Sequence, residues 1–460
     1  MSNPSPVNSV PLENRYQLVE ILEKGSKPTS EWRIGTELEM FGFALPGTDE
    51  TPFSPPPYQN GIGSLLEKFE SAQWGSPIYD EEGDKPTIIG LSGLGKEKGK
   101  AISLEPAGQF ELSGAPLKDL LETEKELTTH FQNVHKFGEE IGYGFSPIGF
   151  QPLWKREEMP WMPKARYKIM RQYMPKVGSL GLDMMTRTCT VQVNLDFSSE
   201  QDMCKKMRVA LALQPVATAI FANSPFKEGK LADCQTMRGK IWLDTDRARS
   251  GQPESFFHES FSFESYIDWA LKTPMYFIRR DGKSLDVTGA SFLSWMEGKA
   301  TGVLADYTPT IGDFEDHLTT LFPDVRLKTF LEMRGADAGS PEMTLGLSAF
   351  WVGLLYHQDV LDEVDELVRS YPIETFKKLH KIVPEKGIHS PFQGGFQPFL
   401  KTLCRLSEKG LKLRNLGEEK LLQPVINIVE TNISQADHWI SRFNGEWAGD
   451  VKNLFLESRI

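Results

Sequence analysis

Four segments in the first three quarters of the chain alternate polar and apolar residues with a period of two. This pattern is typical of β-strands that have one polar and one apolar face. In the first segment, Glu37 and Glu39 share one face while Leu38 and Met40 share the other. The segments are residues 33–42 (RIGTELEMFG), 102–114 (ISLEPAGQFELSG), 188–197 (TCTVQVNLDF) and 330–335 (FLEMRG). The alternation predicts an antiparallel sheet whose strands each turn one face to water.

The polar faces of these four strands carry short acids and amides. The residues concerned are Glu37, Glu39, Glu105, Glu111, Gln192 and Glu332. A solvated sheet would explain any one strand, but clustered carboxylates repel each other unless cations lie between them. Mg²⁺ prefers carboxylate and amide oxygens as ligands. The four strands together therefore predict a magnesium-binding sheet face.

The pattern changes to helical periodicity from about Leu345, most clearly over residues 347–371 and 396–414. We expect an α+β fold, with a sheet-containing part over residues 1–345 and a mainly helical part over residues 346–460. Strand-like segments flank the Pro/Gly-rich residues 45–62, which favours a surface loop over a linker. The chain is therefore predicted to be one catalytic domain.

A cluster of basic residues lies between the second and third predicted strands. It consists of Lys164, Arg166, Lys168, Arg171, Lys176 and Arg187. These residues could be surface charges of a helix that begins near Pro163 and ends before Pro175. Alternatively, they attract anions, and arginines near metal-binding carboxylates would suit phosphoryl transfer.

Composition and charge exclude several classes of partner. The 460 residues include 51 Lys and Arg against 63 Asp and Glu, which gives a net charge of −12. An acidic chain without a basic stripe is a poor ligand for nucleic acid or anionic lipid. The most apolar stretch, residues 347–356, is about half the roughly 20 residues that a membrane helix needs. We expect no nucleic-acid partner and no membrane association.

The first thirty residues have neither the apolar core of a signal peptide nor the acid-poor character of a transit peptide. A cytoplasmic location is the expectation.

Four scattered cysteines, with no CxxC pair, indicate reduced thiols, and Cys189 falls on the apolar face of its strand.

Two motifs are set aside. Residues 90–97 (GLSGLGKE) approach a phosphate-binding loop, but Glu97 replaces the required hydroxyl, so we interpret them as a flexible connection. His130 and His135 are five residues apart and no HExxH motif occurs, which argues against a zinc hydrolase.

Long segments closely resemble the glutamate-cysteine ligases of plants and proteobacteria. They include SLEPAGQFELSGAPL, MPKARYKIMRQYMPKVGSLGLDMMTRTCTVQVNLDFSSE, ALQPVATAIFANSPF, HLTTLFPDVRLKTFLEMRGAD and FWVGLLY. The resemblance covers nearly the whole chain. It implies the catalytic fold shared with glutamine synthetase: a curved antiparallel sheet with flanking helices, whose concave polar face binds metal and ATP.

The resemblance also implies a reaction and a set of site residues. The γ-carboxylate of L-glutamate would attack ATP to form γ-glutamyl phosphate, and the amine of L-cysteine would displace phosphate, which is the first step toward glutathione. One Mg²⁺ would be held by Glu39, Glu105 and Glu111, and another by Glu37, Gln192 and Glu332. Arg166, Arg238 and Tyr276 match residues that contact the glutamyl group, and Arg334 would meet the phosphates. The three arginines would be catalytic.

Plant members have cysteines in place of Val287 and Gly302, and that pair forms a regulatory disulfide. The resemblance implies that this switch is absent here and, with no transit peptide seen, that the enzyme is a bacterial, cytoplasmic one. A monomer or homodimer is expected. Two alternatives remain open: a ligase of the same superfamily that uses another amine, and a non-catalytic amino-acid or nucleotide sensor.

Overall fold

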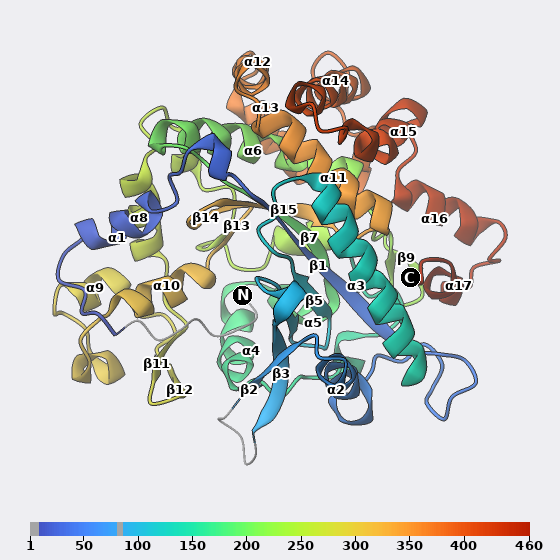
Figure 1. Cartoon of the computed structure of the whole chain (residues 1–460), viewed down its shortest axis with the longest axis horizontal. Coiled ribbons are helices and arrows are strands. Elements are labelled where there is room, and N and C mark those ends of the chain that lie inside the picture. Colours follow the sequence, from blue (N-terminus) through green and yellow to red (C-terminus); the bar gives the residue numbers. More distant parts are fainter. Residues whose placement is uncertain (1–8, 81–85) are drawn as a thin grey trace.

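A nine-stranded antiparallel sheet forms the centre of the computed structural model, which describes residues 9–80 and 86–460 (Figure 1). Its order is β14 (Val325–Leu327), β15 (Leu331–Asp337), β7 (Thr190–Leu195), β1 (Ile34–Ala44), β5 (Phe110–Ser113), β4 (Ala101–Leu104), β3 (Thr87–Gly93) and β2 (Gly75–Asp80). β6 (Tyr143–Ser146) pairs with the C-terminal end of β1, from Phe41 to Ala44. The antiparallel sheet and the mixed helix and strand content confirm the coarse fold prediction.

Three predicted strands are present as β1, β7 and β15. The segment 102–114 was expected to be one strand, but it is the hairpin of β4 and β5. Pro106 and Gly108, which has φ of +84°, form its turn, so the backbone N–H of Glu105 donates to the carbonyl of Gln109 over 2.9 Å. The connection predicted for residues 90–97 is also wrong in part, because residues 90–93 belong to β3.

The apolar face of the sheet packs against long helices. These are α3 (Leu120–Glu140), α6 (Glu200–Ile220) and α11 (Pro341–Leu355). On β1, Thr36 points away from the acidic side chains, and its hydroxyl lies 2.9 Å from that of Ser348 on α11. Leu38, Val191 and Val193 are fully buried in the same core. Aliphatic burial on this face fixes the register and sends every acidic side chain to the other face.

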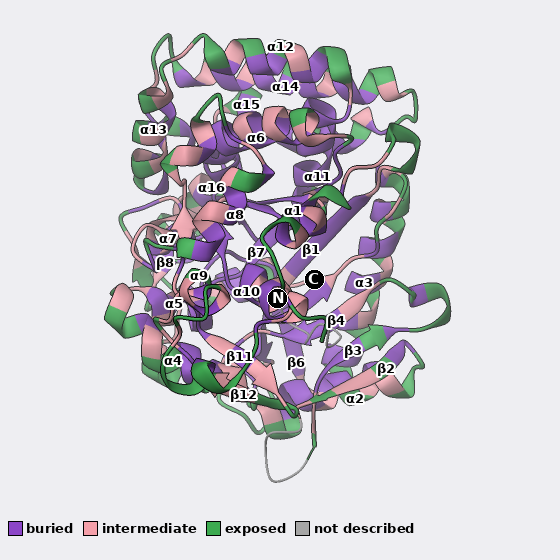
Figure 2. Ribbon diagram, turned by 90° about the vertical axis from the view of Figure 1, so that its left-hand side faces the viewer, coloured by how far each residue is buried: buried purple, intermediate pink, exposed green. Residues whose placement is uncertain are grey.

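The polar face of the sheet is also buried, which corrects the prediction that it faces water. Three helices cover it: α4 (Ala165–Val177), α5 (Gly181–Arg187) and α7 (Met237–Trp242). α4 continues two residues past Pro175, where a stop was expected. Glu111 is only 2% exposed and Glu332 is 0% exposed, consistent with the buried interior in Figure 2.

All secondary structure described after β15 is helical, beginning at Pro341 rather than at residue 346. Four of the later helices gather at one end of the molecule, at the top of Figures 1 and 2: α12 (Gln358–Arg369), α13 (Ile373–Lys386), α14 (Phe396–Arg414) and α15 (Gln423–Thr431). The last two, α16 (Gln435–Asn444) and α17 (Lys452–Glu457), lie at the right of Figure 1. The assignment of residues 1–460 to a single domain stays a prediction.

The remaining elements lie around this framework. The helices are α1 (Tyr16–Glu23), α2 (Gly63–Ser71), α8 (Phe263–Lys272), α9 (Phe292–Met296) and α10 (Ile311–Thr319). The short strands are β8 (Phe226–Lys227), β9 (Lys230–Leu231), β10 (Ser250–Gly251), β11 (Phe277–Arg280), β12 (Lys283–Asp286) and β13 (Phe322–Pro323). Within residues 9–80 and 86–460, no helix is long and apolar enough to span a bilayer.

Candidate active site

The strand register places five of the six predicted acidic and amide residues, together with Asn194, on one face of the sheet. Glu39 is paired with Glu111 of β5, and Glu37 is paired with Gln192 of β7. Further along, Glu332 of β15 is paired with Asn194 of β7, two residues from Gln192. Directly opposed residues of antiparallel strands point to the same side of a sheet. These six side chains therefore form one polar surface.

Glu39, Glu105 and Glu111 form the more acidic part of this surface. The backbone N–H of Thr190 donates to Glu39 over 3.0 Å, and the Ser103 hydroxyl donates to Glu111 over 2.7 Å. Burial, followed by the charges of Glu105 and Glu111, raises the pKa of Glu39 well above its usual range. Such mutual repulsion inside a protein is relieved by a cation.

The chemistry of these three residues fits Mg²⁺, which takes oxygen ligands from carboxylates. Within the described part of the chain, however, no three His, Cys, Asp or Glu side chains are arranged closely enough to hold a metal ion. The three carboxylates would therefore have to move together around a bound ion. Their assignment as ligands stays a prediction.

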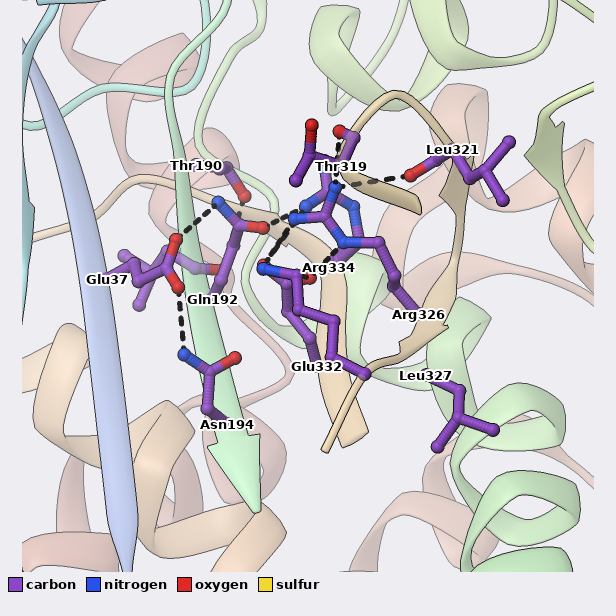
Figure 3. A network of polar contacts seen from close by, with 12 residues as sticks. Glu37, Thr190, Gln192, Asn194, Thr319, Leu321, Arg326, Leu327, Glu332 and Arg334 are labelled. Carbon is purple, nitrogen blue, oxygen red and sulfur yellow. Dashed lines mark hydrogen bonds and ion pairs between the residues drawn. The ribbon is translucent and has the colours of Figure 1, made fainter. Parts of the chain in front are cut away.

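The second predicted metal group, Glu37, Gln192 and Glu332, has a different arrangement (Figure 3). The Gln192 amide N–H donates to Glu37 over 3.4 Å, while its carbonyl oxygen accepts a hydrogen bond from Arg334. Asn194 also donates to Glu37, over 2.8 Å. The only amide oxygen that could bind metal in this group thus already binds an arginine.

Glu332 is surrounded by cations of the protein itself. Arg326 of β14 donates to both of its carboxylate oxygens, one over 2.8 Å, and Arg334 and Lys328 lie 3.3 and 3.9 Å away. Burial alone would raise the pKa of Glu332, but Arg326, Lys328 and Arg334 hold it well below its usual range. This group fits a metal ion less well than the Glu39 group does.

Arg238 and Arg334 lie side by side near both groups. Arg238 of α7 is 3% exposed, and its guanidinium donates to the backbone carbonyl of Arg334 over 2.7 Å. Its Nε has no hydrogen-bond partner in residues 9–80 and 86–460. Burial lowers the pKa of Arg238 more than Asp337 and Glu39 raise it. This buried cation therefore lacks full compensation by the surrounding chain.

Two cavities meet at these arginines. The first, called the acidic cavity, has a volume of about 50 Å³ and is lined by Glu39, Glu105, Pro106, Gln109, Tyr167, Met170, Met184, Met185, Thr188, Thr190, Arg238, Trp242, Phe322 and Arg334. The second, called the histidine cavity, has a volume of about 30 Å³ and is lined by Thr218, Arg238, Gly239, Trp242, Phe322, Pro323, Asp324, Arg334, Gly335, His380 and Pro384. Arg238, Trp242, Phe322 and Arg334 belong to both, so they form the shared wall.

The two other residues predicted to contact glutamate do not line either cavity. Arg166 lies over the ring of Tyr167 at 5.3 Å and is close enough to Glu105 for that carboxylate to raise its pKa. Tyr276 is fully buried, with its hydroxyl 3.3 Å from Asp246 and its ring under the guanidinium of Arg249. Arg166 thus borders the site, whereas Tyr276 lies behind it.

Lys164 belongs to the predicted basic cluster. It is buried, donates to the carbonyl of Leu104 over 2.7 Å, and has its pKa lowered to about 7 by burial and by Arg166. Sequence reasoning missed other residues of the site. Trp242 could have been found, because it lies one helical turn after Arg238. No local sequence pattern pointed to Asp324 or His380.

Plant proteins are similar to this chain along most of its length. A chloroplastic glutamate–cysteine ligase of Brassica juncea is 47% identical over 96% of this chain and 84% of its own, and ligase B of Oryza sativa is 45% identical over 98% and 90%. Both relatives are chloroplastic, which contradicts the expected cytoplasmic location. That expectation was wrong because it relied on the composition of thirty residues, which holds no positive information about the compartment.

Two solved structures share the fold. A glutamate–cysteine ligase of Francisella tularensis in complex with AMP superposes with a TM-score of 0.53, at 11% identity, over 93% of this chain and 87% of its own. A bifunctional glutathione synthetase of Pasteurella multocida gives 0.50 at 15% identity, over 96% and 52%.

The match to a family model is as extensive as the similarity to the plant proteins. The model describes glutamate-cysteine ligase family 2 and matches residues 33–457. The chain belongs to this family of glutamate-cysteine ligases.

Proposed function

We propose that the protein joins the γ-carboxylate of L-glutamate to the amine of L-cysteine and converts ATP to ADP and phosphate. The observation that carries this proposal is the acidic cavity, where Glu39 and Glu105 line the same space as Arg238 and Arg334. The names of the plant relatives support the choice of substrates. Acids that suit a metal and arginines that suit anions are together what phosphoryl transfer to a carboxylate requires.

In the first step, an oxygen of the γ-carboxylate forms a bond to the terminal phosphorus of ATP, and ADP leaves. The reactants are anions that repel each other, so the site must neutralise them and hold them in line. Arg334 of the shared wall would meet the phosphates, and the uncompensated Arg238 would clamp a carboxylate of glutamate. Arg166, beside Glu105, would lie at the edge of the space that holds these phosphates and this carboxylate.

Magnesium held by Glu39, Glu105 and Glu111 would neutralise phosphate charge at the sheet surface. Glu37, Gln192 and Glu332 would instead orient the arginines: Gln192 and Glu332 both contact Arg334, and Glu332 also anchors Arg326. A second magnesium ion fits that group less well, because Glu332 and the Gln192 oxygen already bind arginines. Glu37 already accepts from the amides of Gln192 and Asn194.

In the second step, the cysteine nitrogen attacks the γ-carbonyl carbon, and phosphate leaves with the bridging oxygen. Water is a competing nucleophile that would destroy γ-glutamyl phosphate. The acidic cavity has an apolar side formed by Met170, Met184, Met185 and Phe322. Met184 is half-buried and the other three are buried. This side excludes water from the acyl phosphate.

The finer description of the fold also belongs to this proposal. We take the sheet to be the curved, glutamine-synthetase-like reaction surface, supported by its antiparallel order and by the polar residues on one face. A monomer or a homodimer is the proposed solution state.

A coupled assay of ADP release tests the function directly. L-glutamate and ATP are supplied with L-cysteine, glycine, L-serine or L-alanine, and kcat/KM is compared. We expect cysteine to give the highest value, with γ-glutamylcysteine as the product. Equal or better turnover with another amine would support the alternative ligase, and binding of ATP and glutamate without any ADP release would support the sensor. Glu366→Gln, at an exposed acid on α12, serves as the control variant.

A further inference from the structure

An ion pair between His380 and Asp324 lines the histidine cavity. The Nε2 of His380, on α13, is 2.9 Å from a carboxylate oxygen of Asp324, which lies between β13 and β14. Both residues line the same cavity as Arg238 and Arg334. The pair therefore faces the two arginines to which the proposed function assigns the anionic substrates.

Asp324 is a potential internal counter-ion for Arg238. Its charge raises the pKa of Arg238, after the larger effects of Asp337 and Glu39. Arg238 in turn lowers the pKa of Asp324, after the larger effects of His380 and Gln252. Arg238 is almost fully buried, and its Nε has no partner in the described part of the chain. A buried guanidinium gains strongly from a carboxylate, whether that carboxylate belongs to a substrate or to the protein.

The main chain of Asp324 is held in place. Its N–H donates to the carbonyl of Gly251 over 2.8 Å, and its carbonyl accepts from the N–H of Arg334 over 3.1 Å. The side chain of Asp324 is held by His380 and also makes a hydrogen bond with Gln252. Asp324 raises the pKa of His380 against the effect of burial, which favours the protonated imidazole in this pair.

We propose that His380 is a positioning residue that engages the Asp324 carboxylate and so keeps Arg238 available for a carboxylate of glutamate. This inference rests on the proposed function, since it takes glutamate to be the ligand of Arg238. His380 itself touches neither the substrate nor the reacting atoms. Its effect is to prevent an acid of the protein from competing with the substrate.

The test is the effect of three variants on the KM for glutamate. His380→Ala releases Asp324 toward Arg238, and we expect the KM for glutamate to rise about tenfold, equivalent to about 1.4 kcal/mol. Asp324→Asn removes the competing charge, so the KM for glutamate should fall below the wild-type value. The double variant should behave like Asp324→Asn. The KM for ATP and kcat should change much less in all three.

A purely structural pair predicts another outcome, because loss of either partner would then weaken the enzyme in the same direction. An increased KM for glutamate in Asp324→Asn, or a double variant as impaired as His380→Ala, would overturn the proposal. His380→Gln keeps a hydrogen-bond donor without the charge and should give an intermediate KM if the fold is intact. His258→Ala, at an exposed histidine, is the matched control.

Failure of the proposed function would be seen separately. In that case the wild-type protein itself would form no γ-glutamylcysteine. Calorimetric titration with L-glutamate would still measure the effect of each variant on carboxylate binding. The same order of affinities would support the role of His380, and unchanged affinities would overturn it.

Discussion

Arg326 and Glu332 face each other on β14 and β15 and form a two-point ion pair that is almost completely buried, at 1% and 0% side-chain exposure. Glu332 also lies 3.3 Å from Arg334, which binds Gln192. A chain of ion pairs and hydrogen bonds thus runs from the edge of the sheet through Gln192 to Glu37 (Figure 3). Glu332 is therefore the counter-charge of Arg326 and Arg334, and its role as a metal ligand stays a prediction.

Glu332→Gln should reduce stability as well as activity. The change leaves Arg326 buried without its counter-charge, and breaking a buried pair in this way costs roughly 3 to 5 kcal/mol. Urea unfolding at neutral pH measures the loss. Replacing both partners by apolar residues, Arg326→Met with Glu332→Leu, should recover much of the stability without recovering activity. A fully stable Glu332→Gln that has lost only its response to Mg²⁺ would instead identify Glu332 as a metal ligand.

Glu39→Gln, unlike Glu332→Gln, should not reduce the stability of the metal-free protein. The raised pKa of Glu39 means that its buried charge is unfavourable in the absence of a cation, so the neutral amide should not destabilise the metal-free protein. Turnover should be lost. Thermal unfolding is measured with and without Mg²⁺, because an ion that binds only the folded state raises the midpoint temperature of unfolding. We expect a Mg²⁺-dependent rise in the wild type and a smaller one in Glu39→Gln; equal rises would remove Glu39 from the ligand set.

Arg238→Ala should weaken glutamate use more than ATP use. A desolvated carboxylate that loses its guanidinium is destabilised by roughly 2 to 5 kcal/mol. Arg166→Ala should act in the same direction but less strongly, because Arg166 borders the acidic cavity without lining it. Initial rates at varied glutamate and saturating ATP measure the KM for glutamate and the kcat of each variant. Unchanged KM and kcat in both variants would show that glutamate binds elsewhere.

Activity should be insensitive to the thiol–disulfide balance. All four cysteines are free, and burial raises the pKa of Cys204 to about 11 and those of Cys234 and Cys404 to about 12. The thiolate is the reactive form, so little of it is present at neutral pH. Val287 lines one surface cavity with Thr301 and Val303, the two neighbours of Gly302, and this chain has no cysteine at position 287 or 302. A reversible several-fold change between oxidised and reduced glutathione buffers would reveal a redox control elsewhere.

The sequence predicted the polar sheet face because alternation along β1, β7 and β15 records which side chains enter the aliphatic core. It did not predict that this face is covered. Side chains of α4, α5 and α7 close the cavity above Glu39 and Glu105, and α4 and α7 are distant in sequence from β1 and β5. Period-two alternation distinguishes the two faces of a sheet but does not show what lies against each one.

The same limit explains the residues that were missed. Arg326 lies in a strand of three residues, which is too short to show a period. His380 reaches the cavity from a helix more than fifty residues after Asp324, and only the folded chain brings them within 2.9 Å. The hairpin of β4 and β5 was overlooked because the alternation of polar and apolar residues has the same parity before and after the turn. The turn residues Pro106 and Gly108 therefore appeared to lie within one strand.

The most direct test of the account follows the oxygen of the glutamate side chain. Glutamate labelled with ¹⁸O in its γ-carboxylate is incubated with ATP, Mg²⁺ and cysteine, and the phosphate and nucleotide are analysed by mass spectrometry. If γ-glutamyl phosphate forms, each phosphate released carries one ¹⁸O atom, and the nucleotide product is unlabelled ADP. Unlabelled phosphate, or label found in AMP, would contradict the proposed chemistry.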